Sequence, residues 1–269
     1  MPRFGKYQRY TSDDFQRLGK LGVLYHKVVG LTFAGRYNQG RWFSRILKRH
    51  HLRPRRILDA GCGYGIYSFW LSETFSESSI DGVDLSQDDI RNCKRVQQIT
   101  GRFPNVNFAM GDLTQLQAEN QYDLVLCADV LEHLPAPKEV LARFHRALVD
   151  GGYLYLRIPT RNQHRIFNEK HFGQYDAWAE KEHISQIYDL ASLSQEVQDA
   201  GFVIRFASFT NGWLAQLGFE LGIIFEQRSR ALFALAVPFL KLLYFFDALH
   251  MRRKTGNGCV ILTQKQVST

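Results

Sequence analysis

From residue 56 onward, short apolar runs alternate with longer segments of helical spacing, and this alternation constrains the fold more than any other feature. Strands regularly separated by helices pair in parallel, because each helix carries the chain back to the start of the next strand. Continuous apolar runs are typical of strands that are covered on both faces. The sequence therefore predicts an α/β fold with a doubly wound, mostly parallel sheet.

The boundaries of the elements follow from the same pattern. Strands are expected over residues 56–61, 79–86, 106–112, 122–130, 151–159, 201–209 and 258–265. Helices are expected over residues 67–75, 87–100, 136–149 and 186–200, with two or three more within 13–50. The pattern changes at Pro54, so we expect a basic helical segment, 1–52, followed by the main domain, 53–269.

A long apolar stretch, 211–256, interrupts the main domain between the last two expected strands. Within it, residues 231–251 approach the roughly 20 apolar residues that cross a bilayer, but Pro238, Lys241 and Asp247 lie inside this run. We therefore expect a helical insertion whose amphipathic helices lie on the sheet edge or on a membrane surface. That the helices cap the core or form the interface of a homodimer is an equally open interpretation.

Positive charge is concentrated at the start of the chain. The net charge is +8, and residues 1–56 hold fourteen Lys and Arg residues against only Asp13 and Asp14. Such a segment fits a solvated helical face, or contact with anionic lipid or nucleic acid. The four cysteines lack metal-ligand spacing and indicate buried thiols in a reducing compartment. With no secretory signal at the N-terminus, we expect a cytoplasmic protein.

Glycines and an acid gather where the first expected strand ends. Gly61, Gly63 and Gly65 precede a helix, where glycines let the backbone approach a ligand and expose helix N-terminal N–H groups. A dinucleotide site would have glycine at the sixth position of this turn, which is Ile66 here. Asp59 is a poor neighbour for pyrophosphate but a good one for a cationic ligand.

Two more carboxylates follow the next two strands. Asp84 ends the second strand, where a carboxylate accepts hydrogen bonds from both hydroxyls of a ribose. The alternative role is the N-cap of a helix, for which Ser86 is the better candidate. Asp112 follows the third strand and is placed to reach an adenine amino group, or else it only forms a turn. Three acids at successive strand ends on one sheet edge point to a single ligand.

The segments ILDAGCGYG, VDLS, GDL and YDLVLCADVLEHL, in this order, resemble class I S-adenosylmethionine-dependent methyltransferases of the type-11 group, over about residues 55–209. The resemblance implies a seven-stranded Rossmann-like sheet whose last strand runs antiparallel beside the fifth. It also implies S-adenosylmethionine as the cofactor, with the glycine turn and first acid at its methionine part. The cofactor-binding residues that it implies are Asp59, Gly61, Cys62, Gly63, Asp84, Leu85, Asp112, Leu113 and Ala128.

More narrowly, CADVLEHL is similar to ubiquinone-biosynthesis O-methyltransferases. The counterparts of Asp129, Glu132 and His133 can hold a divalent cation there, but we assign no metal and expect His133 to be a general base or a packing residue. His183, before the helix 186–200, is a second candidate base, and Asp129 lines the site of transfer. NQGR (38–41) resembles a segment whose arginine meets the cofactor carboxylate, which assigns Arg41 to the cofactor.

The predicted activity is O-methylation of a small or lipid- or isoprenoid-linked acceptor, by an enzyme that is peripheral at the inner face of a membrane. Two alternatives stay open. A nucleic-acid methyltransferase would use the basic N-terminus, but the sequence has neither an RNA-binding module nor an N-P-P-Y/F-like element after the fourth strand. A non-catalytic, cofactor-binding scaffold protein would also retain these acids and glycines.

Overall fold

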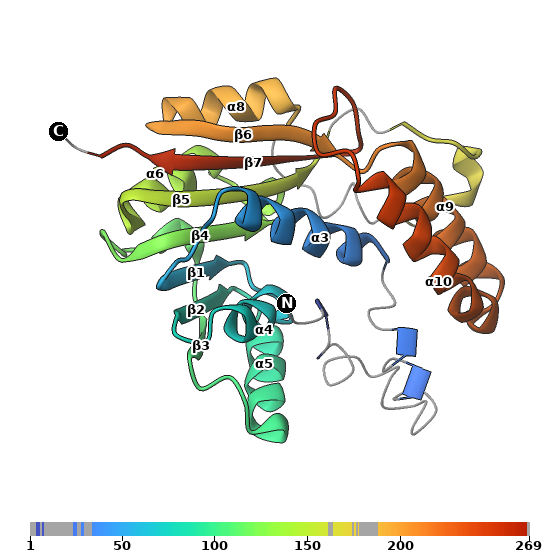
Figure 1. Cartoon of the computed structure of the whole chain (residues 1–269), viewed down its shortest axis with the longest axis horizontal. Coiled ribbons are helices and arrows are strands. Elements are labelled where there is room, and N and C mark those ends of the chain that lie inside the picture. The colour runs from blue at the N-terminus through green and yellow to red at the C-terminus, as the bar shows by residue number, and fades with distance from the viewer. Residues whose placement is uncertain are drawn as a thin grey trace.

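A computed structural model of the chain, shown in Figure 1, describes most of its residues. The described residues are 4, 5, 7, 24, 25, 28, 29, 34–160, 164–173, 175, 177 and 188–267. The first of the expected helices within 13–50, and His183, therefore lie outside the described residues.

One seven-stranded sheet forms the centre of the molecule, in the order β3-β2-β1-β4-β5-β7-β6. The strands are β1 (Arg56–Ala60), β2 (Ser79–Asp84), β3 (Val106–Met110), β4 (Tyr122–Ala128), β5 (Leu148–Pro159), β6 (Phe202–Thr210) and β7 (Gly258–Lys265). The strands β1 to β5 pair in parallel, whereas β7 runs antiparallel between β5 and β6. The predicted fold class is confirmed, including the antiparallel last strand.

Helices cover both faces of this sheet (Figure 1). One face carries α3 (Ala34–Arg49), α4 (Ile66–Thr74) and α5 (Gln87–Thr100), and the other carries α6 (Pro137–Ala147) and α8 (Leu190–Asp199). The sequence predicts that a single residue, 150, separates the helix 136–149 from the strand 151–159, but α6 ends at Ala147 and β5 begins at once at Leu148. Burial on both faces explains the continuous apolar runs of β1 and β4.

The helix α3 belongs to the core of the sheet rather than to a separate layer. Its buried side chains recur at helical spacing, at Trp42, Phe43, Ile46 and Leu47, and they join the cluster that includes Tyr155 of β5. The rings of Phe43 and Tyr155 meet edge to face, with 4.7 Å between centroids. The division of the chain at residues 52 and 53 stays a prediction, and residues 34–49 pack with the domain that follows.

The expected insertion is a helical hairpin, α9 (Trp213–Arg228) and α10 (Arg230–Asp247), at the carboxyl end of the sheet (Figure 1). Small residues on α9 let the helices approach closely. A Cβ on Gly218 would lie 3.1 Å from the Tyr244 ring, and one on Gly222 would lie 3.5 Å from Leu240. Among the described helices, none combines the length and the apolarity that a membrane crossing requires.

A proline inside α10 has an unusual consequence. Pro238 has no N–H, so the carbonyl of Ala234 one turn earlier loses its helical donor. The hydroxyl of Tyr25 donates to this carbonyl at 2.5 Å, and the ammonium of Lys241 donates to the carbonyl of Val29, also at 2.5 Å. Two contacts thus tie the N-terminal part of the chain to α10.

Candidate active site

The turn after β1 gives its glycines different roles. The N–H groups of Gly61 and Cys62 donate to the carbonyl of Val83 at 2.8 and 3.0 Å, which joins the turn to β2. Gly61 has a left-handed φ of 76°, and a Cβ on it would lie 2.3 Å from the side chain of Val130. At Gly63, with φ of 48°, a Cβ would meet nothing within 4 Å. Gly61 therefore makes room for the chain after β4, whereas Gly63 is the glycine that a ligand can approach.

Asp84 holds this turn from the end of β2. One carboxylate oxygen accepts from the N–H of Gly63 at 2.7 Å, and the other accepts from the N–H of Ser86 at 2.9 Å. The helix α5 is capped by Ser86, whose hydroxyl accepts from the N–H of Asp89 at 3.2 Å. Asp84 is therefore not the helix cap, and its lone pairs at the sheet edge suit the hydroxyls of a ribose.

Asp59 is buried under the glycine turn. The hydroxyl of Ser68 donates to its carboxylate at 2.6 Å. Burial raises the pKa of Asp59 from its ordinary 3.8 to about 7, the hydrogen bond from Ser68 opposes that rise, and the charge of Asp84 adds to it. A cation bound above the turn would favour the ionised form of this carboxyl, because opposite charges stabilise one another at short range.

We expect Asp59 to make the stability of the free protein depend on pH. Its folded pKa lies above the unfolded value, so its contribution to stability is complete below about pH 4 and is lost as pH rises through about 7. Asp59→Asn cannot ionise, and its melting temperature should fall less over this range than that of the wild type. Melting curves of both proteins across this range measure the effect; parallel curves would contradict it.

Beyond Asp84, the edge offers apolar surface for a flat ring. Leu85 is 73% exposed after β2 and Met110 is 61% exposed at the end of β3. Asp112 is exposed, and its carboxylate accepts from the N–H and the hydroxyl of Thr114 at 2.8 and 2.7 Å. Leu113, in the turn η2 (Leu113–Gln115), is 5% exposed and packs in the core, and its predicted place beside the adenine stays a prediction. Met110 is the exposed apolar side chain that the sequence did not single out.

Asp129 follows Ala128, the last residue of β4, and has a left-handed φ of 58°. Its carboxylate accepts from the amide of Gln39 at 2.7 Å and forms an ion pair with the guanidinium of Arg157 on β5. Its own N–H donates to the carbonyl of Arg157 at 2.8 Å. The carboxylate thus joins α3, β4 and β5, so its contacts are those of a positioning residue, and its predicted catalytic role stays untested.

The turn η3 (Leu131–His133) contains Glu132 and His133, which differ in their exposure to solvent. Glu132 is buried, and burial together with the charge of Asp129 raises its pKa. The imidazole of His133 is 34% exposed, with its Nε2 atom 4.0 Å from a carboxylate oxygen of Glu132. Within the described residues, no three His, Cys, Asp or Glu side chains are grouped so that they could hold a metal ion. His133 is therefore the residue of this turn that is accessible to an acceptor.

The arginines of α3 lie elsewhere than the sequence suggested. The guanidinium of Arg41 is 4.4 Å from the ring centroid of Phe245 and 3.4 Å from the hydroxyl of Tyr37, which places it at the contact with α10. Arg36 is the arginine near the glycine turn, 5.9 Å from the ring centroid of Tyr64. The predicted contact of Arg41 with the cofactor has no support in this geometry.

The segment after β5 is fastened by the insertion. Glu220 of α9 is 1% exposed, and its carboxylate accepts from the N–H groups of Ile166 and Phe167 at 3.0 and 2.7 Å. The amide of Asn257 exchanges two hydrogen bonds with the backbone of His164, at 2.9 and 3.0 Å. A cavity of about 550 Å³ opens beside His164, between the start of α8 and the loop before β7. These contacts fix the segment that crosses the carboxyl edge of the sheet.

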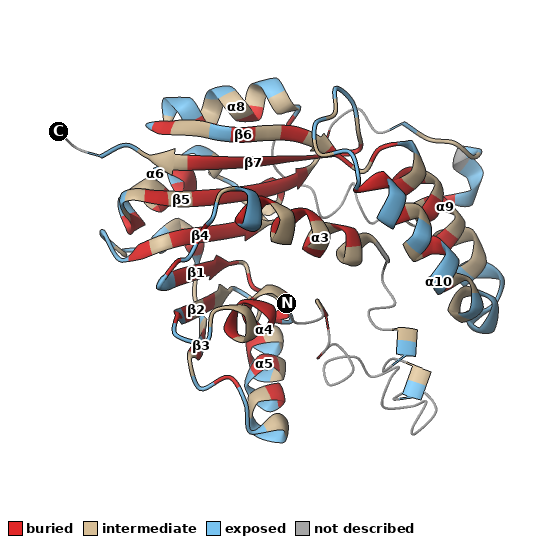
Figure 2. Ribbon diagram, viewed as in Figure 1, coloured by how far each residue is buried: buried red, intermediate tan, exposed pale blue. Residues whose placement is uncertain are grey.

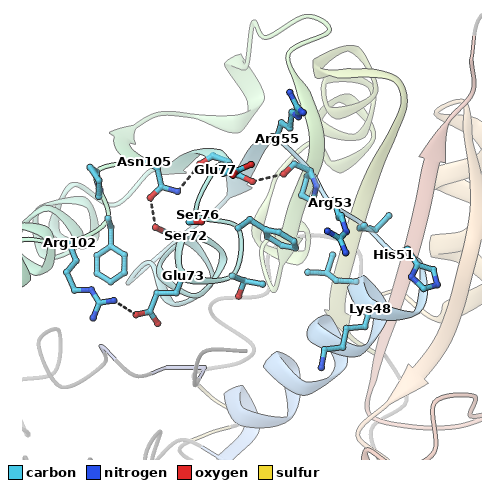
Figure 3. A pocket seen from close by; sticks show the side chains of 18 residues that line it. Lys48, His51, Arg53, Arg55, Ser72, Glu73, Ser76, Glu77, Arg102 and Asn105 are labelled. Carbon is cyan, nitrogen blue, oxygen red and sulfur yellow. Dashed lines mark hydrogen bonds and ion pairs between the residues drawn. The ribbon is translucent and has the colours of Figure 1, made fainter.

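A hollow of about 1550 Å³ lies away from this edge (Figure 3). The loops that lead into β1, β2 and β3 line it, together with the end of α3. Its labelled side chains include Lys48, His51, Arg53, Arg55 and Arg102, and Arg102 pairs with Glu73 at 2.9 Å. This hollow therefore lies at the amino ends of these strands, opposite the edge that carries Gly63 and Asp84.

The residues at the carboxyl edge fit S-adenosylmethionine. The space above Gly63 admits a ligand chain, Asp84 offers acceptors to a ribose, and the exposed Leu85 and Met110 offer apolar cover to an adenine. The buried carboxyl of Asp59 favours a ligand of positive charge.

Comparisons with known proteins agree with this site. The family described as methyltransferase domain matches residues 34–205. A ubiquinone biosynthesis O-methyltransferase of Pseudomonas aeruginosa is 29% identical over 119 residues, which are 44% of this chain and 50% of that protein. A trans-aconitate 2-methyltransferase of Methylobacterium nodulans is 28% identical over 149 residues, 46% of this chain and 55% of that protein. The chain thus spans about half the length of these curated relatives.

Among solved structures, phosphoethanolamine N-methyltransferase 2 of Haemonchus contortus, in complex with S-adenosyl-L-methionine, superposes with a TM-score of 0.62. The sequences are 17% identical, and the match covers 99% of this chain and 60% of that one. The residues that match the family, 34–205, include α3, the glycine turn and the strand ends at Asp84 and Asp112. Because this match spans well over half of the chain, the protein belongs to the methyltransferase-domain family and has the fold of the class I S-adenosylmethionine-dependent methyltransferases.

Proposed function

We propose that this protein transfers the methyl group of S-adenosylmethionine to an oxygen atom of an acceptor that is either a small molecule or a lipid- or isoprenoid-linked one. The observation that carries the proposal is the hydrogen bond from Gly63 to Asp84 at the carboxyl ends of β1 and β2, together with a partly exposed His133 in the turn after β4. S-adenosylmethionine supplies a methyl group on a positively charged sulfur atom. The protein supplies position, exclusion of water and, for an acceptor whose hydroxyl has a high pKa, a base.

His133 is the base that we propose. It is partly exposed at the end of β4, whereas the neighbouring Glu132 is buried and the carboxylate of Asp129 is already bound by Arg157 and Gln39. The choice of oxygen as the acceptor atom is supported by the resemblance to ubiquinone biosynthesis O-methyltransferases. Relatives that act on trans-aconitate or phosphoethanolamine show how widely acceptors differ within similar proteins.

His133→Ala should lower kcat by about a hundredfold or more, the usual contribution of a general base. The Kd for S-adenosylmethionine should stay within about twofold of the wild type, since the predicted cofactor residues are untouched. Calorimetry gives the Kd, and transfer of a radiolabelled methyl group to quinols, lipids, sugars and RNA gives kcat. His145→Ala, in the last turn of α6 where the ring packs against Phe202 of β6, is the matched control.

Two results would redirect the proposal. If His133→Ala loses cofactor binding together with activity, the residue is structural and not the base. If the wild type binds S-adenosylmethionine but methylates only RNA, the acceptor is a nucleic acid and the basic hollow of Figure 3 becomes the surface to test. Binding with no transfer to any acceptor would favour the scaffold alternative.

A further inference from the structure

The outer surface of α10 is unusual for a helix of a globular protein. Six large apolar side chains, spaced alternately three and four residues apart, are all at least 42% exposed, and we call them the α10 face. They are Leu232, Leu235, Phe239, Leu242 and Phe246 of α10, and Leu249 in the turn that follows it. Leu235 is 80% exposed. Figure 2 shows exposed residues along this helix at the rim of the molecule.

No charge interrupts this surface. All residues of α10 are described, and its exposed positions between Arg230 and His250 are apolar. Its two remaining charged residues are turned away, because Lys241 donates to the carbonyl of Val29 and Asp247 is 1% exposed and pairs with Arg253. A contiguous apolar surface of this kind marks an interaction site.

Positive charge borders the α10 face at both ends of the hairpin. Arg228 and Arg230 are exposed at the junction of α9 and α10, and Arg252 and Lys254 are exposed after α10. Only one exposed acid, Glu226, lies near these ends among residues 226–254. The apolar surface is therefore bounded by an excess of cations.

The third border is the contact with α3, a helix that contains five Lys and Arg residues and no acid. Arg41 lies over Phe245, and buried guanidinium nitrogens of Arg41 and Arg45 have no hydrogen-bond partner among the described residues. Burial and the charge of Arg41 lower the pKa of Arg45. The positive charge of α3 therefore lies beside the apolar surface with no acid between the two, and it attracts anionic groups.

We propose that the α10 face docks on an anionic lipid surface, with its apolar side chains among the acyl chains and the bordering cations at the phosphates. A helix with a wide apolar arc and cationic flanks lies in a membrane interface in this way. The spacing of the α10 face would also suit pairing with a second copy. In a symmetric pair, however, the cationic ends would meet cationic ends, which costs affinity. An anionic membrane attracts both ends.

The test is co-sedimentation of the full chain with vesicles, without cofactor or acceptor, so that it is independent of methyl transfer. One set of vesicles is phosphatidylcholine, and the other contains equal parts of phosphatidylcholine and phosphatidylglycerol. The wild type should sediment with the anionic vesicles and lose this binding as salt is raised. The double variant Leu235→Glu, Phe239→Glu should bind at least about tenfold more weakly.

Two further variants serve as tests. One shows whether a new carboxylate elsewhere on the protein has the same effect, and the other measures the contribution of a bordering cation. Ile99→Glu places the same new carboxylate on α5, at a residue that is 54% exposed and away from α10, and should bind like the wild type. Arg252→Gln, which removes an exposed cation after α10, should weaken binding by about fivefold, the share of one interfacial cation. If the melting temperature of the glutamate variant falls, the milder pair Leu235→Gln, Phe239→Gln takes its place.

Several outcomes would overturn the proposal. The proposal is wrong if the wild type binds neither set of vesicles. It is also wrong if the wild type and the folded α10 variants bind equally well. A third such outcome comes from light scattering, which measures the oligomeric state. If the wild type is a dimer that the α10 variants make monomeric while Ile99→Glu stays dimeric, a second copy of the chain covers the α10 face instead.

Discussion

Asp84→Ala is expected to raise the Kd for S-adenosylmethionine by at least about a hundredfold. The substitution removes the acceptors for the ribose and also releases the N–H of Gly63, which the carboxylate holds at 2.7 Å. Hydrogen bonds to a charged group contribute about 1.5–3 kcal/mol each, and each 1.4 kcal/mol is about tenfold in Kd. Calorimetric titration with the cofactor measures the change.

The control for this prediction is Asp88→Asn. Asp88 is exposed in the first turn of α5, four residues further along, and its carboxylate forms an ion pair with the neighbouring Arg91. Its Kd should equal that of the wild type. A loss of less than about fivefold in Asp84→Ala, with the fold intact, would show that the cofactor does not depend on this carboxylate.

Glu220→Ala is expected to have the second large effect, on the segment that crosses the carboxyl edge. It leaves the N–H groups of Ile166 and Phe167 without their buried acceptor, and each such loss costs about 1–3 kcal/mol. We expect amide exchange at both residues to accelerate by at least about tenfold and the KM for the acceptor to rise. The Kd for S-adenosylmethionine should not change, since the glycine turn is untouched.

The matched control is Glu226→Gln, an exposed acid near the end of the same helix. Its exchange rates and KM should equal those of the wild type. Unchanged exchange at Ile166 and Phe167 in Glu220→Ala would contradict the prediction, because it would mean that other contacts hold the segment. A loss of cofactor affinity would show instead that the segment forms part of the cofactor site.

The sheet could be predicted from sequence because its strands are continuous apolar runs that end at glycine or an acid. Asp84 could be assigned for the same reason, since the end of a parallel strand fixes where its last side chain lies. Ser86 could be separated from it as the helix cap because capping follows local chemistry. Each of these assignments depends on residues that are close together in the sequence.

The parts that were missed depend on contacts between distant segments. Glu220 looks like a surface acid in an apolar helix, and only the fold brings it to the N–H groups of residues more than fifty positions earlier. The side chain of Leu113 packs in the core from the short turn after Asp112, and its burial depends on residues of other elements. Arg41 faces α10 because α3 crosses the sheet beside the insertion, an arrangement that no local pattern encodes.

The register of the last two strands has an evolutionary consequence. Thr210 and Gly258 lie opposite one another in the ladder of β6 and β7, so everything between them leaves and rejoins the sheet at a single point. Loops whose ends are neighbours tolerate changes of length at little entropic cost. The hairpin can therefore be exchanged as a unit. Replacing residues 211–257 with those of a relative would change the surface that the hairpin presents, while the strand ends that we assign to the cofactor would stay unaltered.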